Sequence, residues 1–175
     1  MTPDELLAVV GADAAVGAFG CLTLDVDPDR WLTTATTLRD AAGCDFFDWL
    51  SAYDDGAAGL AVVVRVWSVE GRHGVLVRTR VDRDSGSLPT LTPVWAGAAW
   101  HERETREMFG IEFTGHPDPR LLLLPDGFEG NPLRKEFVLA SRVAKEWPGA
   151  KEPGESVAGR KRPLGVPAPN EWGDA

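Results

Sequence analysis

The chain has 175 residues, of which 43% are hydrophobic and 26% are charged, and its formal net charge at pH 7 is −9. This composition is ordinary for one globular domain and excludes a fibrous or wholly disordered chain. The excess of acidic side chains argues against nucleic acid as a partner, because binding to phosphates needs a concentrated basic face.

The first half of the chain predicts alternating helices and strands. Helices are expected over residues 4–12 and about 30–42, and strands over residues 21–27 and 44–54. The valine-rich stretches 60–69 and 73–81 are joined by a short turn at 70–72, which is typical of a β-hairpin. This order predicts an α+β fold, with helices packed on a mixed or antiparallel sheet.

The second half is expected to be largely extended or looped, since eleven of the thirteen prolines lie at or after residue 89. Residues 96–109 predict a helix that Gly110 ends, and residues 110–137 show hardly any periodicity. We expect an α+β domain over residues 1–140, with an irregular second half that wraps a partner. A Pro/Gly-rich arm over residues 141–175 should become ordered only against such a partner.

The predicted helix contains the stretch AWHERETREMFG, in which five of the six positions from 102 to 107 are charged. On an α-helix these positions cover the whole circumference, so charge points inward as well as outward. A solvated surface helix and a partner-binding surface both fit this pattern. The next loop holds Leu121 to Leu124 and Phe128 without an evident core of its own, which favours the partner-binding surface.

This helix does not match a metal or acid/base centre. HERET begins like the zinc motif H-E-x-x-H, but Thr105 stands where the second His would be. Glu102 and Arg106, and also Arg103 and Glu107, stand four residues apart and are predicted to form ion pairs that keep the carboxylates charged. A free-standing enzyme that uses these glutamates is the competing hypothesis, and no catalytic residue is expected.

Cys21 and Cys44 are too few for a four-thiolate iron–sulfur or zinc site, and we expect buried free thiols. No apolar run approaches the roughly 20 residues of a membrane helix. The acidic N-terminus lacks the basic residues of a signal peptide. We therefore expect a protein of the cytoplasmic side that reaches a membrane only through a partner.

Residues 100–137 contain four motifs close together. They are Glu102-Arg103-Glu104, Glu107-Met108-Phe109-Gly110, Gly115-His116-Pro117-Asp118 and Pro132-Leu133-Arg134-Lys135-Glu136-Phe137. Their combination resembles the signature of the C subunit, the 30 kDa-type subunit of the proton-pumping NADH:quinone oxidoreductase, respiratory complex I. The sequence departs from that family pattern at Pro119, Leu121 and Asn131.

The resemblance implies a non-catalytic, cofactor-free subunit of the peripheral arm, docked on the D subunit near the B and I subunits, that supports electron transfer from NADH to quinone. Flavin, iron–sulfur clusters and quinone would belong to partner subunits, and the complex would hold the chain at the cytoplasmic side of the cell membrane. The residues expected at the partner interface are Trp100, Glu102, Arg103, Glu104, Arg106, Phe109, Gly110, His116, Pro117, Pro132, Leu133, Arg134 and Lys135.

The family resemblance also leaves an alternative open. Similar signatures occur in membrane-bound hydrogenases and in quinone-linked dehydrogenases fed by reduced deazaflavin or ferredoxin. An equivalent subunit of such a complex would carry the same motifs, so the sequence does not decide the electron donor.

Overall fold

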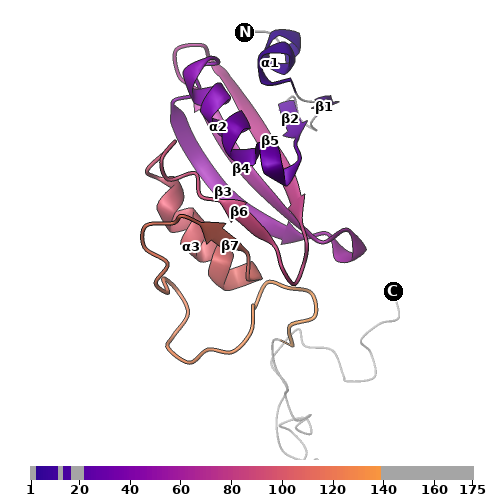
Figure 1. Ribbon diagram of the computed structural model, residues 1–175, viewed down its shortest axis with the longest axis vertical. Coiled ribbons are helices and arrows are strands. Elements are labelled where there is room, and N and C mark those ends of the chain that lie inside the picture. The colour runs from indigo at the N-terminus through magenta and orange to yellow at the C-terminus, as the bar shows by residue number, and fades with distance from the viewer. Residues whose placement is uncertain (1–2, 12–13, 17–21, 139–175) are drawn as a thin grey trace, which may run out of the picture. The chain divides into compact units, whose positions relative to one another are not determined.

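The computed structural model describes residues 3–11, 14–16 and 22–138 (Figure 1). Its helices are α1 (Pro3–Val10), η2 (Pro28–Arg30), α2 (Trp31–Asp40), η3 (Gly56–Ala58) and α3 (Ala98–Phe109). Its strands are β1 (Ala14–Val16), β2 (Leu22–Asp25), β3 (Phe46–Asp54), β4 (Leu60–Ser68), β5 (His73–Val81), β6 (Ser87–Pro89) and β7 (Glu112–Thr114). The predicted arm over 141–175 lies outside the described residues.

The main sheet has five strands in the order β1-β2-β5-β4-β3. β2 pairs parallel with β5, and the other neighbours pair antiparallel. The predicted hairpin is confirmed, with a register that runs from Leu60 opposite Val81 to Ser68 opposite His73. The α+β class with a mixed sheet is therefore confirmed.

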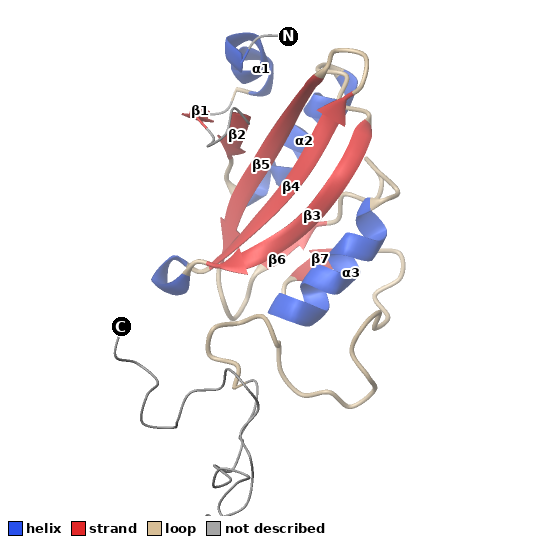
Figure 2. Ribbon diagram, turned by 180° about the vertical axis from the view of Figure 1, so that it is seen from behind, coloured by secondary structure: helices blue, strands red, loops and turns tan. Residues whose placement is uncertain are grey.

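One face of this sheet forms the core. The side chains that alternate onto it are at most 1% exposed, and they include Val62, Val64, Val66, Val75 and Val77. Helix α2 lies across this face (Figure 1) and buries Trp31, Ala35 and Leu38 in the same cluster. Full burial of each large apolar side chain contributes roughly 1.5–3 kcal/mol. No described helix lies across the opposite face, which is turned toward the viewer in Figure 2.

Helix α3 runs along β3, the strand at the edge of the sheet (Figure 2). Its His101 places Nδ1 3.1 Å from the carbonyl oxygen of Leu50 and 3.4 Å from the Leu50 amide nitrogen. The Phe47 ring lies 5.2 Å from the His101 ring and 6.3 Å from that of Trp95. An exposed edge strand presents unpaired backbone groups, and α3 covers part of this one.

A second, two-stranded sheet was not predicted. β6 and β7 pair in parallel, with Leu88 opposite Phe113, and α3 connects them. Residues 87–89 and 112–114 were expected to be loops, and β1 was also missed. Strands of three residues are too short to show an alternating pattern. Because α3 lies between β6 and β7 in the chain, both of its ends are tied to the same small sheet.

Gly110 ends α3 in the left-handed region, at φ 73°, where a Cβ would lie 2.8 Å from the Arg134 guanidinium and from the Asn131 side-chain oxygen. We predict that Gly110→Ala lowers the free energy of unfolding by about 2–3 kcal/mol, from backbone strain and displaced side chains. Gly127 has φ 80° and open space around its Cβ position. Gly127→Ala should therefore lower the free energy of unfolding by only about 1 kcal/mol. Urea denaturation measures the free energy of unfolding of both variants. Equal decreases would contradict the claim that Arg134 and Asn131 leave no room for a Cβ at position 110.

Candidate partner-docking surface

The carboxylate of Glu102 points into the core, and the side chain is 0% exposed. The Leu91 N–H donates to Oε1 at 2.6 Å, and the Thr90 hydroxyl donates to Oε2. His116 Nε2 lies 3.9 Å from Oε2. Burial raises the pKa of Glu102, although the bonds from Thr90 and Leu91 act against the rise. Glu102 therefore fastens α3 to the segment that follows β6.

The predicted ion pair between Glu102 and Arg106 is wrong. Arg106 Nε instead lies 3.0 Å from the Glu112 carboxylate, and Arg106 Nη1 donates to the carbonyl of Pro119 at 2.8 Å. The spacing of four residues brings two side chains together only when both point to solvent. Here the buried N–H of Leu91 draws Glu102 inward, because a buried donor needs an acceptor.

Glu107 anchors the loop of residues 115–137, called here the 115–137 loop. Its carboxylate accepts the backbone N–H groups of three successive residues, Leu122, Leu123 and Leu124. Burial alone would raise the pKa of Glu107, but the bonds from Leu123, Leu124 and Leu122 outweigh it and leave the pKa below its usual range. The leucine backbone is thus turned toward α3.

Other polar side chains bind backbone carbonyls between α3 and this loop. Arg103 donates to the carbonyls of Arg120 and Leu121 at 2.8 and 2.7 Å. His116 Nε2 lies 3.0 Å from the carbonyl of Ala99. Together with the bond from Arg106 to Pro119, these contacts fasten both ends of the stretch 116–121 to the helix.

The last four carbonyls of α3, which have no partner inside the helix, are all satisfied. The Gly110 N–H bonds to the carbonyl of Arg106 at 2.8 Å. The other three bonds come from the 131–134 segment: Asn131 Nδ2 to Glu107, the Leu133 N–H to Met108 and Arg134 Nε to Phe109. The P-L-R motif thus caps this helix, and the Arg134 cation suits the negative end of the helix dipole.

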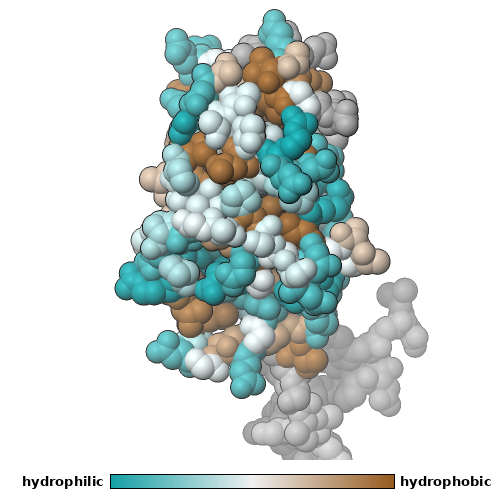
Figure 3. All heavy atoms as spheres, viewed as in Figure 1, coloured by the Kyte–Doolittle hydropathy of each residue, from teal (hydrophilic) through white to brown (hydrophobic). Residues whose placement is uncertain are grey.

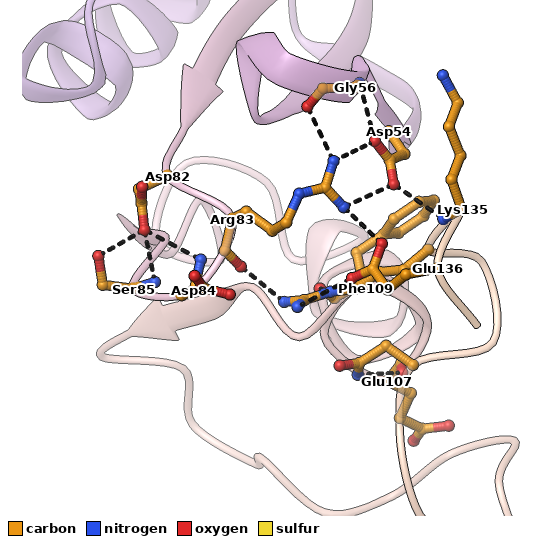
Figure 4. Close-up of polar contacts among 12 residues, drawn as sticks. Asp54, Gly56, Asp82, Arg83, Asp84, Ser85, Glu107, Phe109, Lys135 and Glu136 are labelled. Carbon is orange, nitrogen blue, oxygen red and sulfur yellow. Dashed lines mark hydrogen bonds and ion pairs between the residues drawn. The ribbon is translucent and has the colours of Figure 1, made fainter.

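The end of the same loop is fixed to the main sheet (Figure 4). The Arg83 guanidinium binds both oxygens of the Asp54 carboxylate and the carbonyl of Gly56. Asp54 also accepts the Lys135 N–H at 2.9 Å. The guanidinium of Arg83, with the Lys135 N–H, holds the pKa of Asp54 well below its usual range. Arg134 completes the contact by donating to the carbonyl of Arg83 at 2.8 Å.

With its backbone held by α3, the loop exposes apolar side chains. The large exposed side chains on this part of the chain are Trp100, Leu121, Leu123, Phe128 and Leu133. Figure 3 shows hydrophobic side chains gathered over the loop among hydrophilic ones. Groups of exposed apolar side chains on one part of a surface mark interaction sites. We call α3 and the 115–137 loop together the α3–loop surface.

The structure divides the predicted interface residues into three groups. Trp100, Glu104, Pro117, Leu133 and Lys135 are exposed. Arg103, Arg106, Gly110, His116, Pro132 and Arg134 are half-buried, and Glu102 and Phe109 are buried. The last two have almost no surface to offer a partner, and the charged residues among the half-buried ones bind the chain itself.

Sequence reasoning missed several residues that shape this surface. Glu107 was considered as an acid or base and as a partner of Arg103, but not as the anchor of the loop. Arg83, which joins Asp54 to the loop, carried no local signal because its partners are far along the chain. Leu123 and Phe128 are absent from the expected interface residues, although the sequence already indicates that their loop lacks a core of its own and favours a partner-binding surface.

Chemistry within the described part of the chain is limited. No group of three or more His, Cys, Asp or Glu side chains there could hold a metal ion. Cys44 is buried, and burial raises the pKa of its thiol to about 11. The buried Glu102 cannot touch a substrate in solution. None of the described helices is long and apolar enough to span a bilayer.

Comparison with known families decides the classification. A model of the family described as "Respiratory-chain NADH dehydrogenase, 30 Kd subunit" matches residues 24–143. The chain belongs to this family. The match begins within β2 and covers β3, β4, β5, α3 and the whole 115–137 loop, so the α3–loop surface lies within the part that the family shares.

Curated members of the family are similar over most of their length. The C subunit of NADH-quinone oxidoreductase from Bordetella avium is 37% identical over 160 residues, which cover 80% of this chain and 78% of that protein. The protein of the same name from Maricaulis maris is 38% identical over 158 residues, which cover 82% of this chain and 78% of that protein. The C subunit from Chlorobium phaeobacteroides is 39% identical over 132 residues, which cover 73% of this chain and 77% of that protein.

Two solved structures have a similar fold. The trypsin-resistant fragment (1–134) of Nqo5 aligns with a TM-score of 0.57 and 28% identity, over 66% of this chain and 94% of that fragment. The second structure is a chain of the membrane-bound sulfane sulfur reductase, an archaeal respiratory membrane complex. It aligns with a TM-score of 0.65 and 23% identity, over 78% of this chain and 83% of that chain. The second likeness concerns the fold alone.

The lowered pKa of Glu107 gives a pH-dependent prediction. Its contribution to stability is present above the unfolded pKa, about 4.3, and is lost as the pH falls through the lower folded value. We predict that Glu107→Gln lowers the free energy of unfolding by about 1–3 kcal/mol at neutral pH. The difference from the unmodified chain should shrink below about pH 4.

Urea denaturation across pH tests this prediction. The matched control is Glu112→Gln, because Glu112 is 62% exposed at its side chain and pairs with Arg106 across the surface. An exposed pair of this kind is worth at most about 1 kcal/mol. A Glu107→Gln difference that stays constant down to about pH 3 would contradict the role assigned to the carboxylate.

Proposed function

We propose that this chain is a non-catalytic, cofactor-free subunit in the peripheral arm of a proton-translocating NADH:quinone oxidoreductase. It docks on the D subunit near the B and I subunits and supports electron transfer from NADH to quinone. Flavin, iron–sulfur clusters and quinone are bound by the partner subunits. The complex holds the chain at the cytoplasmic face of the cell membrane.

One observation carries the docking part of this proposal. The 115–137 loop turns its polar backbone toward α3 and exposes Leu121, Leu123 and Phe128. An isolated domain gains nothing from fixing such side chains in water, since apolar surface contributes to stability only when it is covered. Covering by a partner accounts for both features, and a loop fixed in advance loses less conformational entropy on binding.

The chemistry of the described residues supports a role without catalysis. Glu102 and Glu107 are occupied by backbone N–H groups, and the partner-facing groups are apolar side chains and isolated charges. The curated relatives, which are named as C subunits of NADH-quinone oxidoreductases, support NADH as the donor. The likeness to a chain of a membrane-bound sulfane sulfur reductase keeps an equivalent subunit of a hydrogenase or of a non-NADH dehydrogenase as the second candidate.

We also propose that the domain ends near residue 140 and that residues 141–175 form an arm along the partners. The fragment of Nqo5 that resists trypsin ends at its residue 134 and is covered to 94% by this chain. The last contacts in the described part involve Lys135, Glu136 and Phe137, whose ring stacks on that of Phe128. Both observations support a boundary shortly after the P-L-R-K motif.

Affinity purification from gently solubilised membranes tests the function. The tagged chain should co-purify with NADH-oxidising flavin and iron–sulfur subunits, and the assembly should reduce quinone with NADH. Activity with reduced deazaflavin or ferredoxin but not NADH would favour the second candidate. Recovery of a monomer with no membrane association would overturn both.

Arg103→Ala and Arg134→Ala should lower the amount of assembled complex without changing the turnover of each assembled complex. Both arginines hold the loop through backbone carbonyls, and loss of such charge-assisted bonds costs about 1.5–3 kcal/mol each. Arg80→Ala is the matched control, because Arg80 makes a surface pair with Asp55 on the main sheet. Full assembly with a purely kinetic defect would contradict this docking role.

A further inference from the structure

An open groove of about 430 Å³ lies between α3 and the 115–137 loop. Trp100, His101 and Glu104 line it from the helix, and Leu122 and Leu123 line it from the loop. Trp100 is 68% exposed and Leu123 is 58% exposed. The groove therefore combines apolar walls, one aromatic face and one carboxylate.

The loop wall of this groove and His101 are held by contacts within the chain. The Glu107 carboxylate holds the backbone N–H groups of Leu122 and Leu123, and His101 Nδ1 lies within hydrogen-bonding distance of the Leu50 backbone. Trp100 and Glu104 stand four residues apart on one side of α3, so their side chains are neighbours. The loop wall and His101 are thus held in place within the chain itself.

Glu104 differs from the other charged residues of α3. Glu102, Arg103, Arg106 and Glu107 each bind the backbone of the chain. No hydrogen bond or ion pair of Glu104 is found within the described residues, and its carboxylate is exposed at the groove. The groove therefore carries one negative charge that a cation from outside can neutralise.

Arginine is the side chain that can interact with the carboxylate, the indole ring and the leucine side chains of this groove at the same time. Its planar guanidinium binds a carboxylate through two parallel hydrogen bonds and stacks on an indole face such as that of Trp100. Its methylene stem packs on apolar surface such as Leu122 and Leu123. A lysine ammonium would match the charge but neither the stacking nor the paired hydrogen bonds.

We infer that this groove receives an arginine side chain that projects from the surface of a neighbouring subunit. The inference rests on the proposed function, because it takes the α3–loop surface to be the docking face, and it adds the chemistry of the partner at one position. The net charge of −9 favours approach of a basic partner surface.

The test uses the assembled complex. A photoreactive benzophenone amino acid at position 123, in place of Leu123, should capture a peptide of another subunit with an arginine within a few residues of the cross-link. Glu104→Arg should weaken association of the chain with its complex by roughly tenfold or more. Changing the captured arginine to Glu should restore association of the Glu104→Arg chain.

Glu70→Arg, which makes the same charge reversal at the exposed turn between β4 and β5, is the matched control and should associate like the unmodified chain. Because Glu104 is exposed, its variants should unfold at an unchanged temperature, which separates a binding defect from a folding defect. Wild-type association of the Glu104→Arg chain would overturn the inference. Capture of residues 139–175 of this chain, of a second copy or of a peptide without arginine would also overturn it.

These outcomes are distinct from failure of the proposed function. If no respiratory subunits co-purify with the unmodified chain, the function itself fails. If they co-purify and Glu104→Arg has no effect, only the arginine site fails.

Discussion

Residues 115–137 contain no helix or strand, yet their backbone N–H and C=O groups need hydrogen-bonding partners wherever water is excluded. Helix α3 supplies those partners through charged side chains. Glu107 accepts three successive N–H groups, and Arg103 and Arg106 donate to three carbonyls. In return, the 131–134 segment caps the last carbonyls of α3. Helix and loop therefore depend on each other.

These hydrogen bonds between α3 and the loop explain why the loop turns its polar backbone toward α3 and its apolar side chains toward solvent. Since the backbone of Leu122 to Leu124 faces α3, the side chains of Leu121 and Leu123 are left in solvent. The charged helix, which suggests a polar interface, acts as an internal support. In this member of the respiratory-chain NADH dehydrogenase 30 kDa-subunit family, the proposed docking surface is therefore apolar, with single charges such as Glu104.

Regular elements with a local pattern could be predicted from the sequence. Alternating valines in β4 and β5 identified the hairpin, and the glycine at position 110 identified the end of α3. The short strands β6 and β7 could not be predicted, because they pair residues about 25 positions apart without a repeating pattern. The charge around α3 did predict inward-pointing charge, which Glu102 and Glu107 confirm.

The hydrogen-bonding partners of Glu102 and Glu107 could not be predicted from the sequence, for a different reason. Spacing along a helix suggests ion pairs between side chains, but it contains no information on which distant backbone donors remain unpaired. Glu102 meets the N–H of Leu91 and Glu107 meets those of Leu122 to Leu124, and each bond forms only after the chain has folded back. The same holds for Arg83 and Asp54, which join β3 to the loop's end.

The central claim is that Glu107 holds the backbone of Leu122 to Leu124 against α3 in the free chain. Amide hydrogen exchange of Leu122, Leu123 and Leu124 in the isolated protein tests it most directly. The account predicts that these amides are protected in the unmodified chain and lose that protection in Glu107→Gln, while amides of β4 and β5 stay protected in both. Rapid exchange of the three amides in the unmodified chain would contradict the account.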